Sequence, residues 1–201
     1  MTSQLKLTYF QLPARAELSR LLLTYSKVPF EDLRIPFAAW GALKSKTPMG
    51  KLPVLEVDGV MYYQSMAIAR YAAKIGGLYP EDPLECLRVE MISETLCEPY
   101  EEYIDIYYYE KDEYKKAQKT KKLLDETLPQ KLGILASMIK GDYFMGNKAT
   151  FVDIQLFDLF ESSLGKFIPG FSTDPYPELE AIVKRVKANP EIAAYLAKHL
   201  P

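Results

Sequence analysis

The sequence contains few of the residues that form metal centres and serine-type catalytic triads. Among 201 residues there are two cysteines and one histidine. Cys86 and Cys97 are not spaced as a CxxC pair or as a zinc-binding motif, so a Cys/His metal site is not expected. His199 alone gives little basis for a Ser-His-Asp triad. We therefore expect no metal requirement, and we expect both cysteines to be reduced residues of the core.

A leader segment, a membrane span and an excess of one charge are also missing from the sequence. The chain has no charged-then-apolar N-terminal stretch and no run of about 18 apolar residues, which predicts a cytoplasmic protein that does not enter a membrane. The net charge is −2 and no basic run is present, so nucleic-acid binding is not expected. At 48% hydrophobic and 26% charged residues, the chain can bury the core of one large or two small domains.

Strand and helix patterns alternate in the first part of the chain, which predicts an α/β domain with a mixed four-stranded sheet. Leu5, Leu7 and Tyr9 alternate with polar residues, as in a strand over residues 4–10, and Pro13 then opens a helix. The other elements predicted here are a strand at residues 31–35, a short helix at 38–46, two strands at 54–57 and 60–63 joined by an Asp58-Gly59 turn, and a helix at 65–75.

Residues 50–71 carry two features suited to binding. Pro53 forces Leu52 into an extended backbone, and its N–H and C=O groups can pair with a peptide laid alongside. Ser65, next to Gln64, is expected to cap the following helix, and a helix N-terminus with free amides attracts a carboxylate. From these residues alone, an ordinary strand opening and an ordinary helix cap explain the same pattern.

From Gly76 onward only helix patterns occur, which predicts an all-α second domain. The proline-rich stretch at residues 80–84 is the predicted linker, so we expect the domains at residues 1–79 and 85–201. A long helix follows the linker, and Pro99 inside it predicts a bend. Further helices are predicted at residues 114–140 with an interruption at Pro129, after Pro175 and after Asn189.

Thr150 and Asp153 have the spacing of a capping box at the start of an apolar helix. In such a box each side chain bonds an exposed backbone amide of the other residue. Asp153 is therefore expected to stabilise the fold and not to act as an acid catalyst.

A set of motifs along the whole chain resembles the cytosolic glutathione transferases. Each motif is weak alone, but their order and spacing across two domains make the set specific. The resemblance is strongest to the sigma class, which includes the glutathione-dependent prostaglandin D synthases and the lens S-crystallins. The motifs are Leu7-Thr8-Tyr9-Phe10, Arg15-Ala16-Glu17, Trp40, Gly50-Lys51-Leu52-Pro53, Val57-Asp58-Gly59, the stretch from Gln64 to Tyr71, and the box from Thr150 to Asp153.

This resemblance implies a thioredoxin-like first domain, a helical second domain, a cis bond before Pro53 and a homodimer. Glutathione is the implied co-substrate. Tyr9 would donate a hydrogen bond to the glutathione sulfur and stabilise its thiolate, and Arg15 would add positive charge and help Tyr9 act as a neutral donor.

The resemblance also implies how the rest of glutathione is bound. The Leu52 backbone would pair with the cysteinyl part, and Gln64 and Ser65 would hold the γ-glutamyl carboxylate. Glu98 of the neighbouring subunit would meet the γ-glutamyl ammonium, although Cys97 stands where the prostaglandin synthases tend to carry one more acid. The residues expected around the glycyl end and in the adjoining loop are Trp40, Lys44, Gly50, Lys51 and Pro53.

The pocket for a second substrate is expected between the two domains, lined by Phe10, Tyr100, Tyr103 and Leu159. The same aromatic and aliphatic residues, at helical spacing, also fit an ordinary core. An apolar pocket favours conjugation of glutathione to hydrophobic electrophiles, with hydroperoxide reduction as a further activity. Two alternatives remain open: a glutathione-dependent prostaglandin-type isomerase, and a non-catalytic ligand carrier or crystallin-like structural protein.

Overall fold

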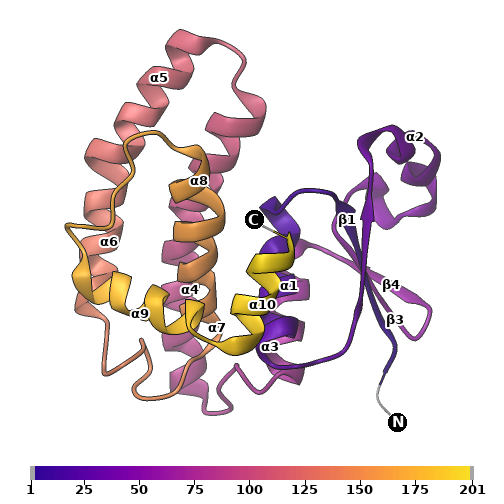
Figure 1. Ribbon diagram of the computed structural model, residues 1–201, viewed down its shortest axis with the longest axis horizontal. Coiled ribbons are helices and arrows are strands. Elements are labelled where there is room, and N and C mark those ends of the chain that lie inside the picture. The colour runs from indigo at the N-terminus through magenta and orange to yellow at the C-terminus, as the bar shows by residue number, and fades with distance from the viewer. Residues whose placement is uncertain (1–2, 200–201) are drawn as a thin grey trace.

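A four-stranded mixed sheet forms the centre of the N-terminal part of the computed structural model, which describes residues 3–199 (Figure 1). Strand β1 (Leu5–Phe10) lies between two other strands, and its alternating apolar side chains Leu5, Leu7 and Tyr9 are all buried. It pairs in parallel with β2 and antiparallel with β3, so the sheet is mixed, as predicted. The order of the strands is β2 (Glu31–Ile35), β1, β3 (Val54–Val57), β4 (Val60–Tyr63).

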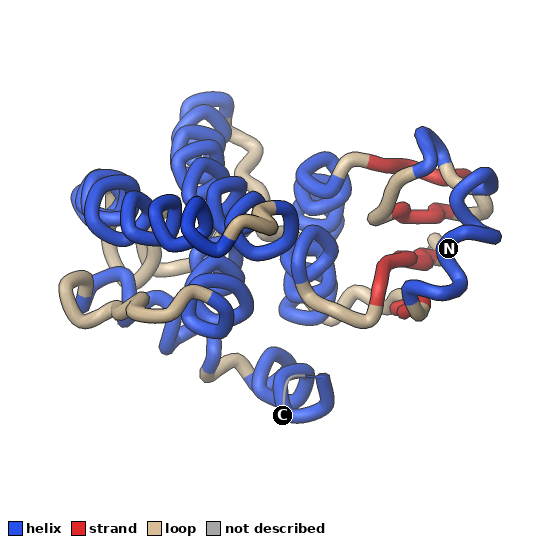
Figure 2. The backbone as a smooth tube through the Cα atoms, turned by 90° about the horizontal axis from the view of Figure 1, so that it is seen from above, coloured by secondary structure: helices blue, strands red, loops and turns tan. Residues whose placement is uncertain are grey.

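Helices α1 (Ala14–Tyr25) and α3 (Ser65–Ile75) pack together and lie between the sheet and the C-terminal helices (Figure 2). The short helix expected near Trp40 is present as α2 (Trp40–Leu43), with 3-10 turns at Phe37–Ala39 and Lys44–Lys46. This segment lies on the side of the sheet that is remote from the C-terminal helices (Figures 1 and 2). The loop between this segment and β3 covers residues 47–53 and is available to line a binding site.

A tight turn joins β3 to β4, as predicted. Asp58 and Gly59 have φ angles of 50° and 85°, and two consecutive positive φ angles are typical of a type I′ hairpin turn. The carboxylate of Asp58 accepts a hydrogen bond of 2.8 Å from the Gln4 amide, which ties the turn to the start of β1.

The start of α3 differs from the prediction that Ser65 caps this helix. The N-cap residue is Gln64, whose φ of 76° turns the backbone sharply, and no side chain caps the first amides. Ser65 is instead the first helical residue. The first-turn amides and the Ser65 hydroxyl are therefore available to a ligand.

The C-terminal part is all-helical, as predicted. It begins with α4 (Pro83–Ile104), where the Asp82 carboxylate accepts hydrogen bonds of 3.0 Å from the amides of Leu84 and Glu85. This start falls inside the stretch expected as linker, and the domain limits at residues 79 and 85 remain a prediction, as does the bend at Pro99. The other helices are α5 (Glu113–Lys122), α6 (Leu128–Ser137), α7 (Phe151–Phe157), α8 (Gly165–Phe167), α9 (Pro177–Lys187) and α10 (Pro190–His199).

Helices α4, α5 and α7 are each followed by a π-helical turn, at Asp105–Tyr109, Leu123–Thr127 and Asp158–Leu164. The second of these divides the single helix expected over residues 114–140, and Pro129 lies in the first turn of α6. A π turn inserts a residue relative to α-helical spacing. Side chains after each turn therefore point in directions that a 3.6-residue period does not predict.

The capping box at the start of α7 is confirmed. The carboxylate of Asp153 accepts hydrogen bonds from the Thr150 amide at 2.7 Å, the Thr150 hydroxyl at 3.0 Å and the Phe144 amide at 3.0 Å. Burial raises the pKa of Asp153 to about 6, and these donors partly offset that rise. The residue thus holds the loop before α7 against the helix start.

A buried polar network joins the last helix to the first. The Tyr195 hydroxyl of α10 donates to Glu17 of α1 at 2.8 Å and accepts from Arg34 at 2.8 Å. Glu17 is also paired with Arg20, which is fully buried and bonds Asp32 at 3.0 Å. Within residues 3–199 no helix is both long and apolar enough to span a membrane.

Candidate active site

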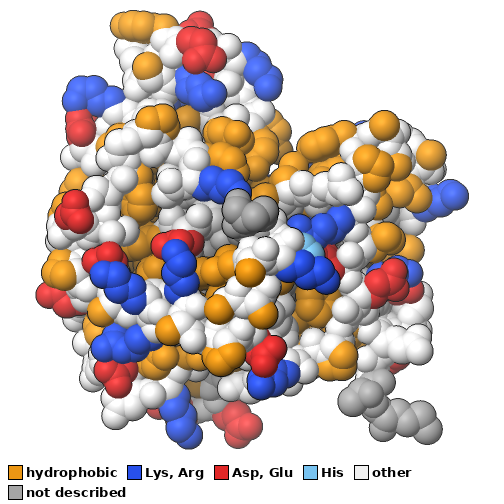
Figure 3. Space-filling model, viewed as in Figure 1, with side chains coloured by type: hydrophobic (Ala, Val, Ile, Leu, Met, Phe, Trp, Pro, Cys, Tyr) orange, Lys and Arg blue, Asp and Glu red, His pale blue; other side chains and the backbone are white. Residues whose placement is uncertain are grey.

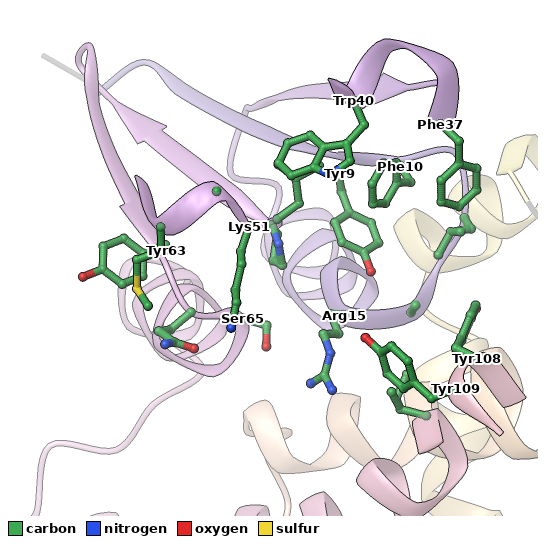
Figure 4. Close-up of a pocket in the computed structure, with 18 residues that line it drawn as sticks. Tyr9, Phe10, Arg15, Phe37, Trp40, Lys51, Tyr63, Ser65, Tyr108 and Tyr109 are labelled. Carbon is green, nitrogen blue, oxygen red and sulfur yellow. The ribbon is translucent and has the colours of Figure 1, made fainter. Parts of the chain in front are cut away.

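A cleft of about 670 Å³ lies between the N-terminal domain and the π-helical turn that follows α4. Figure 3 shows it as a notch between the two halves of the molecule, with apolar side chains on both of its sides. Phe10, expected in the second-substrate pocket, lines this cleft. Most of the residues predicted for the glutathione site line the same cleft (Figure 4): Tyr9, Arg15, Trp40, Gly50, Lys51, Leu52, Pro53, Gln64 and Ser65.

Tyr9 reaches the cleft from the end of β1, and its ring is almost completely buried. Burial raises the pKa of Tyr9 to about 12, while the backbone N–H and the charge of Arg15 act in the opposite direction. The hydroxyl is therefore protonated at neutral pH and can donate a hydrogen bond. The expectation that Arg15 keeps Tyr9 neutral is wrong, because a nearby cation favours the phenolate, and burial is what retains the proton.

Arg15, in the first turn of α1, forms a two-pronged ion pair with Glu101 of α4. Its guanidinium nitrogens lie 2.7 and 2.8 Å from the two Glu101 oxygens, and this contact raises the pKa of Arg15. The pairing joins the two walls of the cleft and compensates the charge of Arg15. Sequence reasoning missed Glu101, since a residue 86 positions away gives no local signal.

The loop before β3 presents backbone to the cleft. The Leu52–Pro53 bond is cis, as the resemblance implies, and the sheet ladder begins only at Val54, so Leu52 stands just outside it. Lys51 lines the cleft beside Leu52. Lys44 does not line it, because its aliphatic chain lies over Gly50, where a Cβ atom would come within 3.4 Å of it.

Gln64 and Ser65 bring the start of α3 to the cleft, where Ser65 lies on the same side as Arg15 (Figure 4). The positive φ of Gln64 is a strained conformation for a residue that is not glycine, and it costs about 1 kcal/mol or more. Together with the free amides of α3, these two side chains form a polar pocket suited to a carboxylate.

The helical side of the cleft differs from the prediction. It is formed by Ile104, Tyr108 and Tyr109, which sequence reasoning missed, and Tyr103 is fully buried with its ring against Phe167 at a centroid distance of 6.0 Å. The π turn at the end of α4 brings the later tyrosines to the cleft, which a continued α-helical period does not predict.

Tyr100 and Leu159 also lie outside the cleft. Both line a separate small cavity behind it, and Leu159 is buried. Phe37 does line the cleft and was missed, although an aromatic residue three positions before Trp40 was an available signal. It stacks on Phe10 with ring centroids 4.4 Å apart.

Glu98 is exposed on α4 and forms an ion pair of 2.5 Å with Lys131 of the same chain. Its role toward glutathione in a neighbouring subunit remains a prediction. Cys86 and Cys97 are both free thiols and only partly buried, and burial raises the pKa of Cys97 to about 11. Among residues 3–199, no three His, Cys, Asp or Glu side chains are grouped so that they could hold a metal ion.

Comparison with known proteins matches both halves of the chain. The family model described as glutathione S-transferase, N-terminal domain, matches residues 5–74, and the one described as glutathione S-transferase, C-terminal domain, matches residues 99–199. Hematopoietic prostaglandin D synthase of Gallus gallus is 36% identical over 196 residues, and a glutathione S-transferase of Anopheles gambiae is 35% identical over 196 residues. Each alignment covers 96% of this chain and 95% of the relative.

Among solved structures, the Fasciola hepatica sigma class GST superposes with a TM-score of 0.87 at 30% identity. The match covers 100% of this chain and 99% of that one. The likeness therefore extends over both domains and the cleft between them.

Proposed function

The chain belongs to the glutathione S-transferase family and is a glutathione transferase, and we propose that its Tyr9 activates the glutathione thiol for attack on uncharged hydrophobic electrophiles. The observation that carries this proposal is the buried, protonated Tyr9 hydroxyl at the base of the cleft.

Activation of the thiol requires stabilisation of its anion. A free thiol has a pKa of about 8.5, so only a few per cent is thiolate near neutral pH. A hydrogen bond to a charged group contributes about 1.5–3 kcal/mol, which lowers a thiol pKa by roughly one to two units. Because the pKa of Tyr9 is raised to about 12, its hydroxyl keeps its proton and can supply this hydrogen bond across the physiological pH range.

The lining of the cleft supports one placement of glutathione. The γ-glutamyl carboxylate would occupy the start of α3, with Gln64 and Ser65, and the cysteinyl backbone would pair with Leu52. Lys51 and Trp40 lie where the glycyl end would then fall. This placement directs the thiol toward Tyr9.

The charges of the cleft support an uncharged second substrate. In the part of the chain that the structure describes, the charged residues lining the cleft are Arg15 and Lys51. Arg15 is compensated by Glu101, and Lys51 is assigned to the glycyl carboxylate. Phe10, Phe37 and the tyrosines of the opposite wall offer aromatic surface, so we propose conjugation of neutral, apolar electrophiles.

On the same family premise, we propose a homodimer and a cytoplasmic location. The strand β4 exposes Val60, Met61 and Tyr62, and α4 exposes Leu84 and Leu87. Exposed apolar side chains on these two elements are suited to a subunit interface.

The test is an ultraviolet titration of glutathione bound to the wild type and to Tyr9→Phe, with turnover of an aryl halide measured in parallel. We expect the bound thiol to have a pKa well below 8.5 in the wild type, to return toward that value in the variant, and turnover to fall about 10- to 100-fold. The control is Tyr114→Phe, which changes an exposed tyrosine outside the cleft. If the wild type binds glutathione without lowering its pKa, Tyr9 is not the activator and the carrier or structural role becomes the better interpretation.

A further inference from the structure

A small cavity lies behind the cleft, where α1, the start of α3, α4 and the end of α7 meet. Its volume is about 30 Å³. It shares Arg15 and Ser65 with the cleft, and its far wall includes Cys97, Tyr100, Gln155 and Asp158.

Two side chains that line this cavity are buried and incompletely bonded. Gln155 is 6% exposed and its Nε2 donates to the Ser93 carbonyl at 3.1 Å, but its Oε1 has no partner among the described residues. Asp158 is 4% exposed, and within residues 3–199 its Oδ1 is likewise without a partner. Buried polar atoms are nearly always hydrogen-bonded to protein or to ordered water, so a ligand is indicated here.

The size of the cavity identifies the class of ligand. A buried water molecule needs about 10–15 Å³ of such volume and two to four polar partners. The space is therefore sufficient for one or two water molecules and too small for an organic ligand. Gln155 and Asp158 are one turn apart on the same helical segment, so both can bond the same water.

The charge state of Asp158 follows from its neighbours. The buried network beside it already contains two cations, Arg20 and Arg34, and two carboxylates, Glu17 and Asp32. Both carboxylates are fully engaged by these cations and by the Tyr195 hydroxyl. A third buried negative charge would have no counter-ion.

We propose that the cavity is a binding site for one or two water molecules, held between the Gln155 amide oxygen and a neutral Asp158 carboxylic acid that donates its proton to the water. The site makes Asp158 a positioning residue for the glutathione pocket, since the water fills the space directly behind Arg15 and Ser65. This last role depends on the proposed function, and the water site itself does not.

The titratable groups around Asp158 agree with a neutral acid. Those that face it are Glu17 and Arg20 from α1 and Tyr100 from α4, while its own helical segment contributes the Ser162 hydroxyl. Burial, with a contribution from Glu17, raises the pKa of Asp158 well above its ordinary value, while the Ser162 hydroxyl and the Arg20 charge act in the opposite direction and only partly offset it. Arg15, Cys97 and Glu101 line the same cavity, but Arg15 and Glu101 compensate each other.

The protonation state is tested by comparing the stability of the wild type and Asp158→Asn at several pH values. A carboxyl with a raised folded pKa binds its proton in the native state and not in the unfolded state, so wild-type stability falls as pH rises above the unfolded aspartate pKa of about 3.9. The amide does not titrate. We therefore expect the unfolding constant of the wild type, relative to the variant, to rise by up to about tenfold per unit between about pH 5 and pH 7.

Asp174→Asn is the matched control, because Asp174 is exposed. The unfolding constant of the wild type relative to this variant should change little between about pH 5 and pH 7. A flat ratio for Asp158→Asn would show an ionised carboxylate and overturn the proposal. If that variant does not fold, infrared spectroscopy of the wild type decides, since a neutral acid gives a protonated-carboxyl C=O stretch at pH 7 and its absence overturns the assignment.

The water is tested by a high-resolution crystal structure of the wild-type protein. Density within hydrogen-bond distance of Asp158 Oδ1 and Gln155 Oε1 is expected, and a dry cavity would refute the site. For the positioning role, Asp158→Leu should raise KM for glutathione about tenfold with a smaller change in kcat, and Asp158→Asn should recover most of that loss. An unchanged KM in Asp158→Leu would refute this role alone, whereas an inactive wild type with an intact water site would count against the proposed function.

Discussion

At the scale of single residues, the charge of the cleft depends on one pair. Arg15 faces the cleft but is bonded through both prongs to Glu101 of α4. Glu101 therefore determines whether the cleft presents a net positive charge to a second substrate. The position of Arg15 at the cleft could be predicted from the sequence because Arg15 belongs to a local motif, whereas its partner is determined by the packing of two domains.

Removal of Glu101 should change selectivity more than folding. In Glu101→Gln the Arg15 charge is no longer compensated, and it gains about 1 kcal/mol of attraction for an anionic substrate in a partly exposed site. We expect kcat/KM for a carboxylated electrophile to rise about fivefold relative to its uncharged analogue. Paired steady-state assays with the two compounds measure this ratio.

Glu161→Gln is the control for this prediction, because Glu161 is also ion-paired, to Lys187 at 2.6 Å, but its cation partner, unlike Arg15, does not line the cleft. An unchanged ratio in Glu101→Gln would mean that the pair does not determine the charge that the substrate meets.

At the scale of elements, the two aspartate caps differ in burial. Asp82 at the start of α4 is exposed, and water can replace its bonds. Asp153 at the start of α7 is completely buried and accepts from Phe144 and Thr150. Loss of the aspartate cap should therefore lower the free energy of unfolding more at Asp153 than at Asp82.

Asp153→Ala should lower the free energy of unfolding by about 2–4 kcal/mol, because it leaves the buried Phe144 amide and the partly buried Thr150 amide without an acceptor. Asp82→Ala should lower it by only about 1 kcal/mol. Urea denaturation of the two variants beside the wild type measures both values. Equal losses would show that burial does not decide the weight of these caps.

The elements also show which part of the fold was accessible from sequence. The strands, the Asp58-Gly59 turn and the Thr150 box were predicted correctly because each depends on residues within a few positions of one another. The π-helical turns were not, since their spacing depends on packing and has no local residue signature. That omission explains why Tyr108 and Tyr109 were not predicted to line the cleft.

At the scale of the whole molecule, the Tyr195 network makes the two domains depend on each other. The hydroxyl of Tyr195 bridges Glu17 and Arg34, which belong to the N-terminal domain. This contact joins α10 to α1, which lie side by side (Figure 1). We expect the domains to unfold together.

Tyr195→Phe should weaken this coupling and cost about 1–3 kcal/mol, because a buried Glu17 oxygen loses its donor. Trp40, the single tryptophan, reports on the N-terminal domain by fluorescence, while far-ultraviolet circular dichroism is dominated by the C-terminal helices. The two signals should change at the same urea concentration in the wild type. Tyr114→Phe, at an exposed position, serves as control, and separate transitions in the wild type would contradict the coupling.

The contact between Glu17 and Tyr195 spans 178 positions of the sequence. During synthesis the N-terminal sheet and α1 leave the ribosome long before α10 does. Until the last helix arrives, Arg20 can pair with Glu17 and Asp32, but one Glu17 oxygen lacks its Tyr195 donor and must stay hydrated. The polar network of the N-terminal domain can therefore be completed only when translation is nearly finished.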